Sequence, residues 1–260
     1  MTPTVIKISG ALVDASDEMA ALWSALMPLL NQTSVVLVHG GGKQMNDLAD
    51  RLGHTPRRVH GRRVTTDLDL EIAKWTMSGG LNTQLVAQAT ARDCAAVGLS
   101  GADAGQVRVS KRPPWCINGD TVDFGWVGDI EVVDGTLVEG LLDRDLLPVV
   151  APLGVDETGQ VYNVNADTVA SALAAELGAR RLLFVTGTGG VRRDADDPTS
   201  QLDECDHNTF ETGVEEGWIV GGMRVKVETA LEALAAGVDH AAICAPTDVR
   251  DRARGTTITL

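Results

Sequence analysis

The stretch Ser34-Val-Val-Leu-Val-His39-Gly-Gly-Gly-Lys43, followed by Gln44-Met-Asn-Asp-Leu-Ala-Asp-Arg-Leu52, decides the fold class of this chain. Its β-branched run predicts a buried strand, its three glycines a tight turn, and the spacing after them a helix. The backbone N–H groups at the start of such a helix, together with its dipole, can cradle an anion. Neither GxxxxGK[ST] nor GxGxxG spacing is present, so a purely structural βα turn fits these residues as well.

The same alternation of strand and helix patterns continues along the chain, which predicts parallel βαβ units. Strands are expected at Val5–Ile8, Val35–Val38, Ala95–Leu99, Leu147–Val150, Leu182–Val185 and Ala241–Cys244. Helices are expected at Glu18–Leu30, Gln44–Leu52, Leu68–Ala91, Gly135–Arg144, Thr168–Leu177 and Gly222–Ala236. Between Val107 and Val133 the pattern is irregular and predicts a β-hairpin excursion around Trp115 and Trp126.

Composition limits the classes of protein to consider. A chain of 260 residues is long enough for one large α/β unit or two fused lobes. The formal net charge of −14 argues against a nucleic-acid partner, because phosphate binding needs a basic surface. The sequence has no membrane-length apolar run and no secretory signal, so we expect a cytoplasmic protein without a membrane partner. The cysteines lack CxxC spacing and predict reduced thiols: Cys94, Cys116, Cys205 and Cys244.

Two further segments place polar residues where a ligand could bind. Lys7 lies inside the apolar run Val5-Ile-Lys-Ile-Ser-Gly10, where a charged residue is unexpected without a partner. Asn163, Asn165 and Asp167 occupy alternate positions, so an extended backbone would point all three side chains to one face. Such a face could orient a polar ligand. The alternative is that Asp167 only caps a helix and that the asparagines are turn residues.

Five segments in order along the chain resemble the amino-acid kinase family, and within it the N-acetyl-L-glutamate kinases of arginine biosynthesis. They are Lys7 with Ser9-Gly10, Val38-His-Gly-Gly-Gly42, Gly61-Arg-Arg-Val-Thr65, Asn163-Val-Asn-Ala-Asp167 and Gly222-Met-Arg-Val-Lys226. The resemblance covers nearly the whole chain from residue 5 onward. Two positions depart from the family pattern. Ser9 replaces one of two glycines, and Gly187 replaces the usual aspartate in Thr186-Gly-Thr-Gly-Gly190.

The resemblance implies an α/β fold whose open, mostly parallel eight-stranded sheet is sandwiched between helices. Residues 1–177 would form an N-terminal lobe for the amino-acid substrate and for dimerisation. Residues 178–260 would form a C-terminal lobe for the nucleotide. Ligands of open α/β sheets bind beyond the carboxyl ends of the strands, where Gly10, Gly40 and Gly187 are expected to lie.

The activity implied by the resemblance is phosphorylation of the γ-carboxylate of N-acetyl-L-glutamate by ATP, with Mg²⁺ arriving on the nucleotide. A carboxylate is already a nucleophile, so the enzyme must mainly bring two anions together and stabilise their charge. The family pattern makes Lys7, Lys226 and Asp167 the catalytic residues. Lys7 would contact the transferred phosphoryl group and Lys226 the nucleotide phosphates, while Asp167 would lie between the lysines and orient both. Backbone amides of Gly10 and Gly41 would also donate to the phosphoryl group.

The substrate contacts implied by the resemblance lie in the first two thirds of the chain. Arg63 would clamp the α-carboxylate with two parallel hydrogen bonds, because the family pattern Gly-x-Arg-Val-Thr selects it over Arg62. The alternative is that either arginine is only a surface charge. Asn163 and Asn165 would bind the acetamido group and the α-carboxylate, and Gly41-Gly42 would contact the acyl end.

In the nucleotide half, Gly187, Gly190 and Lys226 would contact ATP, and no residue is assigned to a metal. Asn82 matches a family asparagine on a helix, but a place on the helix surface fits it equally well. His39 is either a turn residue or a hydrogen-bonding group inside the site, and it receives no catalytic role.

Two other functions fit the same fold. One is a kinase for carrier-protein-linked aminoadipate or glutamate. The other is a non-catalytic amino-acid or nucleotide sensor, against which the intact Lys7, Asp167 and Lys226 argue. Arginine-inhibited family members carry an additional N-terminal helix that links dimers into a hexameric ring, whereas only four residues precede Val5 here. We therefore expect an arginine-insensitive homodimer, in which Leu68–Ala91 is either a contact helix or buried inside its own lobe.

Overall fold

The computed structural model describes residues 2–59, 61–117 and 119–260, and it confirms the expected α/β fold class. Eight strands form one open sheet in the order β14-β16-β15-β13-β1-β2-β10-β5. Parallel pairs join β1 to β13, β13 to β15, β14 to β16 and β10 to β5, whereas β15 and β16 run antiparallel. Its strands are β1 (Thr4–Ile8), β2 (Val35–His39), β5 (Ala96–Ser100), β10 (Leu147–Ala151), β13 (Arg181–Val185), β14 (Glu204–Cys205), β15 (Ala241–Cys244) and β16 (Thr256–Ile258).

The predicted helices lie close to their expected positions. The helices are α1 (Gly10–Asp14), α2 (Ser16–Leu30), α3 (Gly42–Arg51), α4 (Asp67–Ala73), α5 (Asn82–Thr90), α6 (Thr136–Leu142), α7 (Ala166–Glu176), α8 (His207–Glu215) and α9 (Gly221–Ala235). Of these, α1 and α8 are two helices that the sequence did not predict. The single helix expected at Leu68–Ala91 is interrupted by a π-helical segment, η1 (Lys74–Leu81), between α4 and α5. Such segments are rare and are often found at functional sites.

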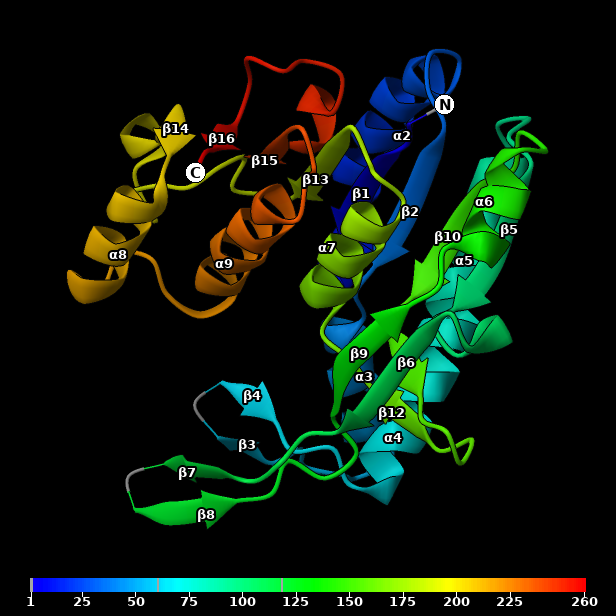
Figure 1. Cartoon of the computed structure of the whole chain (residues 1–260), viewed down its shortest axis with the longest axis vertical. Helices are drawn as coiled ribbons and strands as arrows, with labels where there is room; N and C mark the ends of the chain where they lie inside the picture. Colours follow the sequence, from blue (N-terminus) through cyan, green and yellow to red (C-terminus); the bar gives the residue numbers. More distant parts are fainter. Residues whose placement is uncertain (1, 60, 118) are drawn as a thin grey trace. The chain divides into compact units, whose positions relative to one another are not determined.

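The irregular region after β5 contains the predicted β-hairpin excursion. A smaller sheet has the strand order β12-β11-β6-β9. Its strands are β6 (Val107–Lys111), β9 (Gly128–Val133), β11 (Leu153–Val155) and β12 (Val161–Asn163). Two hairpins, formed by β3 (Arg58–Val59) with β4 (Arg62–Arg63) and by β7 (Trp115–Ile117) with β8 (Asp120–Val122), extend together beside this sheet (Figure 1).

The chain groups into two compact units. The first unit comprises Met1–Val38 with Ala170–Leu260, and its core includes Trp23 and Phe184, which are almost completely buried. The second unit comprises His39–Val169, in which α5 and α6 pack against β10. The expected N-terminal lobe of residues 1–177, for the amino acid and dimerisation, and the expected C-terminal lobe of residues 178–260, for the nucleotide, stay predictions.

Two observations complete the fold. Among the described residues, no helix combines the length and the apolar character needed to cross a membrane. All four cysteines are free thiols, as their spacing predicts. Burial raises the pKa of Cys205 to about 11 and that of Cys244 to about 12, so both remain protonated near neutral pH.

The region Leu68–Ala91, which was expected to be either a contact helix or a helix buried inside its own lobe, has mostly buried apolar side chains. Ile72, Met77, Leu81 and Leu85 are at most 3% exposed, which matches burial inside their own unit. Trp75 differs from them, because it is 52% exposed. The homodimer itself stays a prediction.

Candidate active site

The glycine turn after β2 has the geometry of an anion cradle. Gly41 occupies the N-cap position of α3 and has no side chain to cap the helix. A Cβ at Gly41 would lie only 2.5 Å from Cγ of Met77 in η1, so the close packing of the π-helical segment requires glycine there. At Gly42, by contrast, no described atom lies within 4 Å of the position that a Cβ would take, apart from its chain neighbours and the backbone of its own helix. The turn therefore presents an uncapped helix N-terminus beside open space, as an anion site requires.

Arg63 is the most firmly held of the predicted substrate residues. Its side chain is only 7% exposed, and its Nη1 donates to Oδ1 of Asp69 at 2.8 Å. Its Nη2 donates to Oδ1 of Asn46 in α3. These two acceptors fix the plane of the guanidinium group and leave further N–H donors for an anion.

Asp69 and its capping partner were not predicted from the sequence. Asp69 is completely buried, and its Oδ2 accepts hydrogen bonds from Oγ1 of Thr66 at 2.6 Å and from the Thr66 N–H at 3.2 Å. His54 Nε2 lies 3.2 Å from the same oxygen. Burial alone would raise the pKa of Asp69, but hydrogen bonds from Thr66 and Arg63 hold this pKa below its usual value. The carboxylate therefore stays ionised and anchors Arg63. The spacing Thr66-x-x-Asp69, a capping box, is the signal that could have found it.

The neighbouring Arg62 has a different environment. Its Cζ lies 4.9 Å from the centroid of the Trp115 ring, and Cζ of Arg112 lies 5.1 Å from the same ring. Trp115 also packs edge-on against Phe124, with ring centroids 5.2 Å apart. Arg62 therefore ties the β3–β4 hairpin to the β7–β8 hairpin, whereas Arg63 points into the polar network around Asp69.

Asn163 lies beside the segment that follows Arg63. Its Nδ2 donates to Oγ1 of Thr65 at 3.2 Å, and its backbone N–H donates to the carbonyl oxygen of Trp126 at 2.9 Å. Gly125 makes this approach possible. It has a φ of 69°, and a Cβ there would lie 2.2 Å from the Thr65 carbonyl oxygen. The structure thus brings Asn163 and the Arg63 hairpin together, as the predicted substrate site requires.

Asn165 and Asp167 do not continue the strand, which corrects one prediction. The extended segment β12 ends at Asn163, and α7 begins at Ala166. Oδ1 of Asn165 accepts from the N–H groups of Asp167 at 2.8 Å and Thr168 at 3.2 Å. Asn165 is therefore the N-cap, and the alternative that Asp167 caps the helix is wrong. Asp167 lies in the first turn and is buried, where the helix dipole stabilises its negative charge.

Asn82 and His39 form a buried polar link within the second unit. Nδ2 of Asn82 lies 3.2 Å from Nε2 of His39 and donates to the carbonyl oxygens of Leu99 and Val149 at 3.1 and 2.9 Å. Asn82 is 4% exposed, so the alternative of a place on the helix surface is wrong. Nδ1 of His39 lies 3.1 Å from the carbonyl oxygen of Gly40. A proton on Nδ1 lets His39 donate to the Gly40 carbonyl and leaves Nε2 as an acceptor, so the two N–H hydrogens of the Asn82 amide are shared among three acceptors.

In the first unit, Lys7 is the penultimate residue of β1, lies opposite Phe184 of β13, and is only 5% exposed. The strand leads directly into α1. Oγ of Ser9 accepts from the N–H of Leu12 at 3.2 Å and so caps this helix. The serine that replaces a family glycine therefore has a structural role. Gly10 follows it as the first residue of α1.

The turn after β13 lies at the same end of the sheet as Gly10, because β1 and β13 are parallel neighbours. Gly187 is exposed, and a Cβ there would lie 3.3 Å from a carboxylate oxygen of Glu18. Glu18 of α2 thus places a carboxylate beside the position where the family usually has an aspartate. Gly190 is buried, and a Cβ there would lie 2.7 Å from side-chain atoms of Gln201 and Thr256. Packing alone explains this glycine.

Lys226 lies one turn inside the N-terminus of α9. Its Nζ donates to the carbonyl oxygen of Gly222 at 3.4 Å, so the ammonium group lies over the first turn of the helix. The N-cap residue is Val220, whose side chain cannot accept a hydrogen bond. A positive charge beside an uncapped helix N-terminus is suited to phosphate groups.

Comparison with known proteins places these features in a family. A model of the Amino acid kinase family matches residues 2–245. Acetylglutamate kinase from Methanopyrus kandleri is 39% identical over 239 residues, which are 92% of this chain and 93% of that protein. Acetylglutamate kinase from Symbiobacterium thermophilum is 40% identical over 239 residues, covering 91% of this chain and 81% of that protein.

Comparison with a solved structure supports the same fold. The fold matches N-acetylglutamate synthase from Neisseria gonorrhoeae, in complex with coenzyme A and N-acetyl-glutamate, with a TM-score of 0.81 at 23% identity. The match covers 100% of this chain but only 59% of that longer chain. This likeness shows the fold alone, whereas the family match and the identity to the two kinases show that the chain belongs to the amino acid kinase family.

Proposed function

We propose that this chain is an acetylglutamate kinase, which transfers the γ-phosphoryl group of ATP to the γ-carboxylate of N-acetyl-L-glutamate in arginine biosynthesis. The identity of 39% to such a kinase over 92% of the chain supports this activity. The structural observation that supports a carboxylate substrate is the way in which Arg63 is held. A guanidinium group anchored on Asp69 and Asn46 is prepared for a carboxylate before any substrate arrives.

The second unit would hold the amino-acid substrate. Arg63 binds its α-carboxylate through the N–H groups that Asp69 and Asn46 leave available. Asn163 binds the acetamido group with its carbonyl oxygen, since its Nδ2 is directed to Thr65. Asn165 acts mainly through its position at the start of α7. The backbone of Gly41-Gly42 lies along the acyl end, where the open space at Gly42 accommodates it.

The transferred group and the nucleotide would be bound by lysines and helix N-termini. Lys7 stabilises the negative charge that develops on the phosphoryl oxygens, with backbone N–H donors from Gly10 and Gly41. Lys226 and the N-terminus of α9 hold the phosphates that leave as ADP. Asp167 would orient the ammonium groups of the two lysines, as the family resemblance implies. Gly187 leaves room for the nucleotide, and Glu18 supplies the nearby carboxylate.

ATP is the phosphoryl donor in this proposal, and Mg²⁺ enters with it. Mg²⁺ is usually held by substrate phosphates, waters and few protein oxygens. It neutralises phosphate charge during the transfer. The described residues offer no group of three or more His, Cys, Asp and Glu side chains for a metal, and phosphate-borne Mg²⁺ needs none. The homodimer and the cytoplasmic location belong to the same proposal, and both stay predictions.

An ADP-release assay tests the proposed activity against the alternatives. N-acetyl-L-glutamate, glutamate, aminoadipate and carrier-linked glutamate or aminoadipate are compared as acceptors at equal concentration. We expect kcat/KM to be highest for free N-acetyl-L-glutamate, because its acetamido group meets Asn163. Preference for a carrier-linked acceptor would favour the related kinases. Turnover only with free glutamate would overturn the assignment of N-acetyl-L-glutamate as the substrate. If no acceptor led to ADP release, the result would favour a non-catalytic sensor.

The two glycines of the α3 turn allow a matched test of the substrate position. Gly41→Ala brings a methyl group against Met77, so we expect the free energy of unfolding to fall by about 1–3 kcal/mol. Gly42→Ala meets open space and should change stability by less than about 0.5 kcal/mol. Because that space is assigned to the acyl end, Gly42→Ala should still raise KM for N-acetyl-L-glutamate. Urea unfolding and steady-state kinetics measure both effects. Unchanged kinetics in Gly42→Ala would remove Gly42 from the site.

A further inference from the structure

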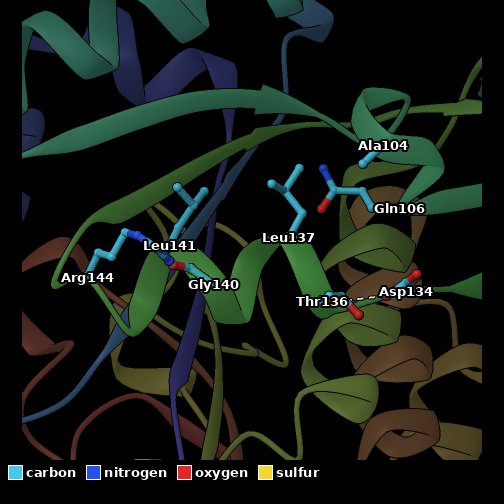
Figure 2. Close-up of a pocket in the computed structure, with 8 residues that line it drawn as sticks. All are labelled: Ala104, Gln106, Asp134, Thr136, Leu137, Gly140, Leu141 and Arg144. Carbon is cyan, nitrogen blue, oxygen red and sulfur yellow. Dashed lines mark hydrogen bonds between the residues drawn. The ribbon is translucent and has the colours of Figure 1, made fainter.

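A cavity of about 480 Å³ lies in the second unit, away from the residues assigned to the kinase reaction. Its walls come from α6 and from the segment before β6 (Figure 2). The residues that line it are Ala104, Gln106, Asp134, Thr136, Leu137, Gly140, Leu141 and Arg144. None of the predicted substrate, phosphate or nucleotide residues is among them. This volume is within the range of small-molecule sites.

Gln106 carries the main polar feature of this cavity. The residue is 1% exposed, and its Nε2 donates to the carbonyl oxygen of Ser100 at 2.7 Å. That bond fixes which end of the amide is the oxygen. Oε1 is buried and accepts no hydrogen bond from any described residue. Figure 2 shows the amide of Gln106 facing Leu137 across the cavity.

The backbone around Gln106 is firmly held, so this acceptor is prepositioned. Its N–H donates to the carbonyl oxygen of Asp103 at 3.1 Å, and its own carbonyl oxygen accepts from the N–H of Asp134 at 2.8 Å. A buried acceptor without a partner is costly, typically more so than the hydrogen bond is worth when made. A ligand that brings an N–H or O–H group to Oε1 would remove this cost.

The two ends of the cavity differ in charge. At the start of α6, the carboxylate of Asp134 accepts from the N–H of Thr136 at 2.9 Å and makes that end negative. At the other end, Nη1 of Arg144 donates to the carbonyl oxygen of Gly140, and the rest of the guanidinium remains available. Arg144 forms no ion pair with a carboxylate among residues 2–59, 61–117 and 119–260. Leu137 and Leu141 provide an apolar surface between the ends (Figure 2).

We propose that this cavity binds an elongated, mostly apolar carboxylic acid that carries an N–H or O–H group. Its carboxylate pairs with Arg144, its body packs on Leu137 and Leu141, and its donor meets Oε1 of Gln106. Helix α6 ends at Leu142, and the Arg144 side chain folds back so that its Nη1 reaches the carbonyl oxygen of Gly140. Gly140 is three helical positions after Leu137, which is about 4.5 Å along the helix axis at 1.5 Å per residue. The inference does not rest on the proposed kinase activity.

Indole-3-butyrate is a suitable probe, because it combines an apolar ring, an N–H group and a carboxylate at the end of a chain. Calorimetric titration of the full chain compares it with 4-(1-naphthyl)butyrate, which lacks the N–H group, and with indole-3-butyramide, which lacks the charge. We expect one molecule per chain, and at least about tenfold weaker binding for each analogue. Because only the ligand changes, this comparison is free of any effect on folding.

Two variants and one control locate the site. Arg144→Gln should weaken binding of indole-3-butyrate but not of indole-3-butyramide. Leu137→Trp should fill the cavity and abolish binding of both. Arg51→Gln changes an arginine at the end of α3 and should alter nothing. Equal affinity for the three compounds, binding that survives Leu137→Trp, or no binding at about 10 mM probe would overturn the proposal. Far-UV circular dichroism and urea unfolding of the same preparations report that each variant is folded.

Discussion

Replacing Lys7 or Lys226 by alanine is expected to lower kcat by about 10²- to 10³-fold, the usual effect of removing one preorganised donor to a developing charge. Lys7 is the sharper case, because it is 5% exposed in an otherwise apolar strand, where burying a charge is costly. Lys226 lies over the first turn of α9, where its loss should also weaken ATP binding. Steady-state kinetics with both substrates measures each effect.

The design must separate lost catalysis from lost folding. Lys7→Met keeps the long apolar stem of the side chain in β1, so its packing beside Phe184 is retained while the charge is removed. Lys43→Ala is the matched control, since Lys43 is an exposed lysine that pairs with Asp47 at 3.0 Å on α3. It should leave kcat unchanged. If Lys7→Met folded normally and kept full kcat, the charge of Lys7 could not act on the phosphoryl group.

The strands and the glycine turns were predictable from the sequence because their causes are local. An apolar β-branched run such as that of β2 is buried wherever it lies, and glycine follows where the chain must turn. The conformation of Asn165 also has a local cause. That cause is helix capping, which competes with the alternation of side chains in a strand. An asparagine before a helix caps it, so the extended backbone ended before Asn165 and the three side chains did not share a face.

Other features depend on contacts that no local pattern contains. Gly41 must be glycine because Met77 approaches it, and that approach arises from the π-helical segment rather than from the turn. The difference between Arg62 and Arg63 arises in the same way. One meets Trp115 on a separate hairpin, and the other meets Asn46, which lies 17 positions earlier in the chain. Spacing alone treats the two arginines as equivalent, so only the resemblance separated them.

Arg63→Ala is expected to raise KM for N-acetyl-L-glutamate by more than tenfold, with a smaller loss of kcat and an unchanged KM for ATP. A residue that binds the substrate and the transition state equally has this effect. The variant should also lose about 3–5 kcal/mol of stability, because it leaves the buried carboxylate of Asp69 without its charged partner. Arg62→Ala is the control, because Arg62 stacks on Trp115 and should leave KM unchanged.

The pH dependence of this stability loss identifies its cause. The folded pKa of Asp69 lies below its usual value of 3.8, so its ionised form stabilises the native state above that pH and this contribution is lost in acid. The difference in unfolding free energy between the natural chain and Arg63→Ala should therefore be largest near neutral pH and shrink below about pH 4.

A double variant then separates binding from stability. Arg63→Ala with Asp69→Asn removes the unpaired charge, so it should recover part of the stability while KM for N-acetyl-L-glutamate stays high. Recovery of KM in the double variant would show that Arg63 only neutralises Asp69. A raised KM that persists after the charge is gone requires instead that the guanidinium group itself contacts the substrate carboxylate. Urea unfolding across pH, together with kinetics at neutral pH, distinguishes these outcomes.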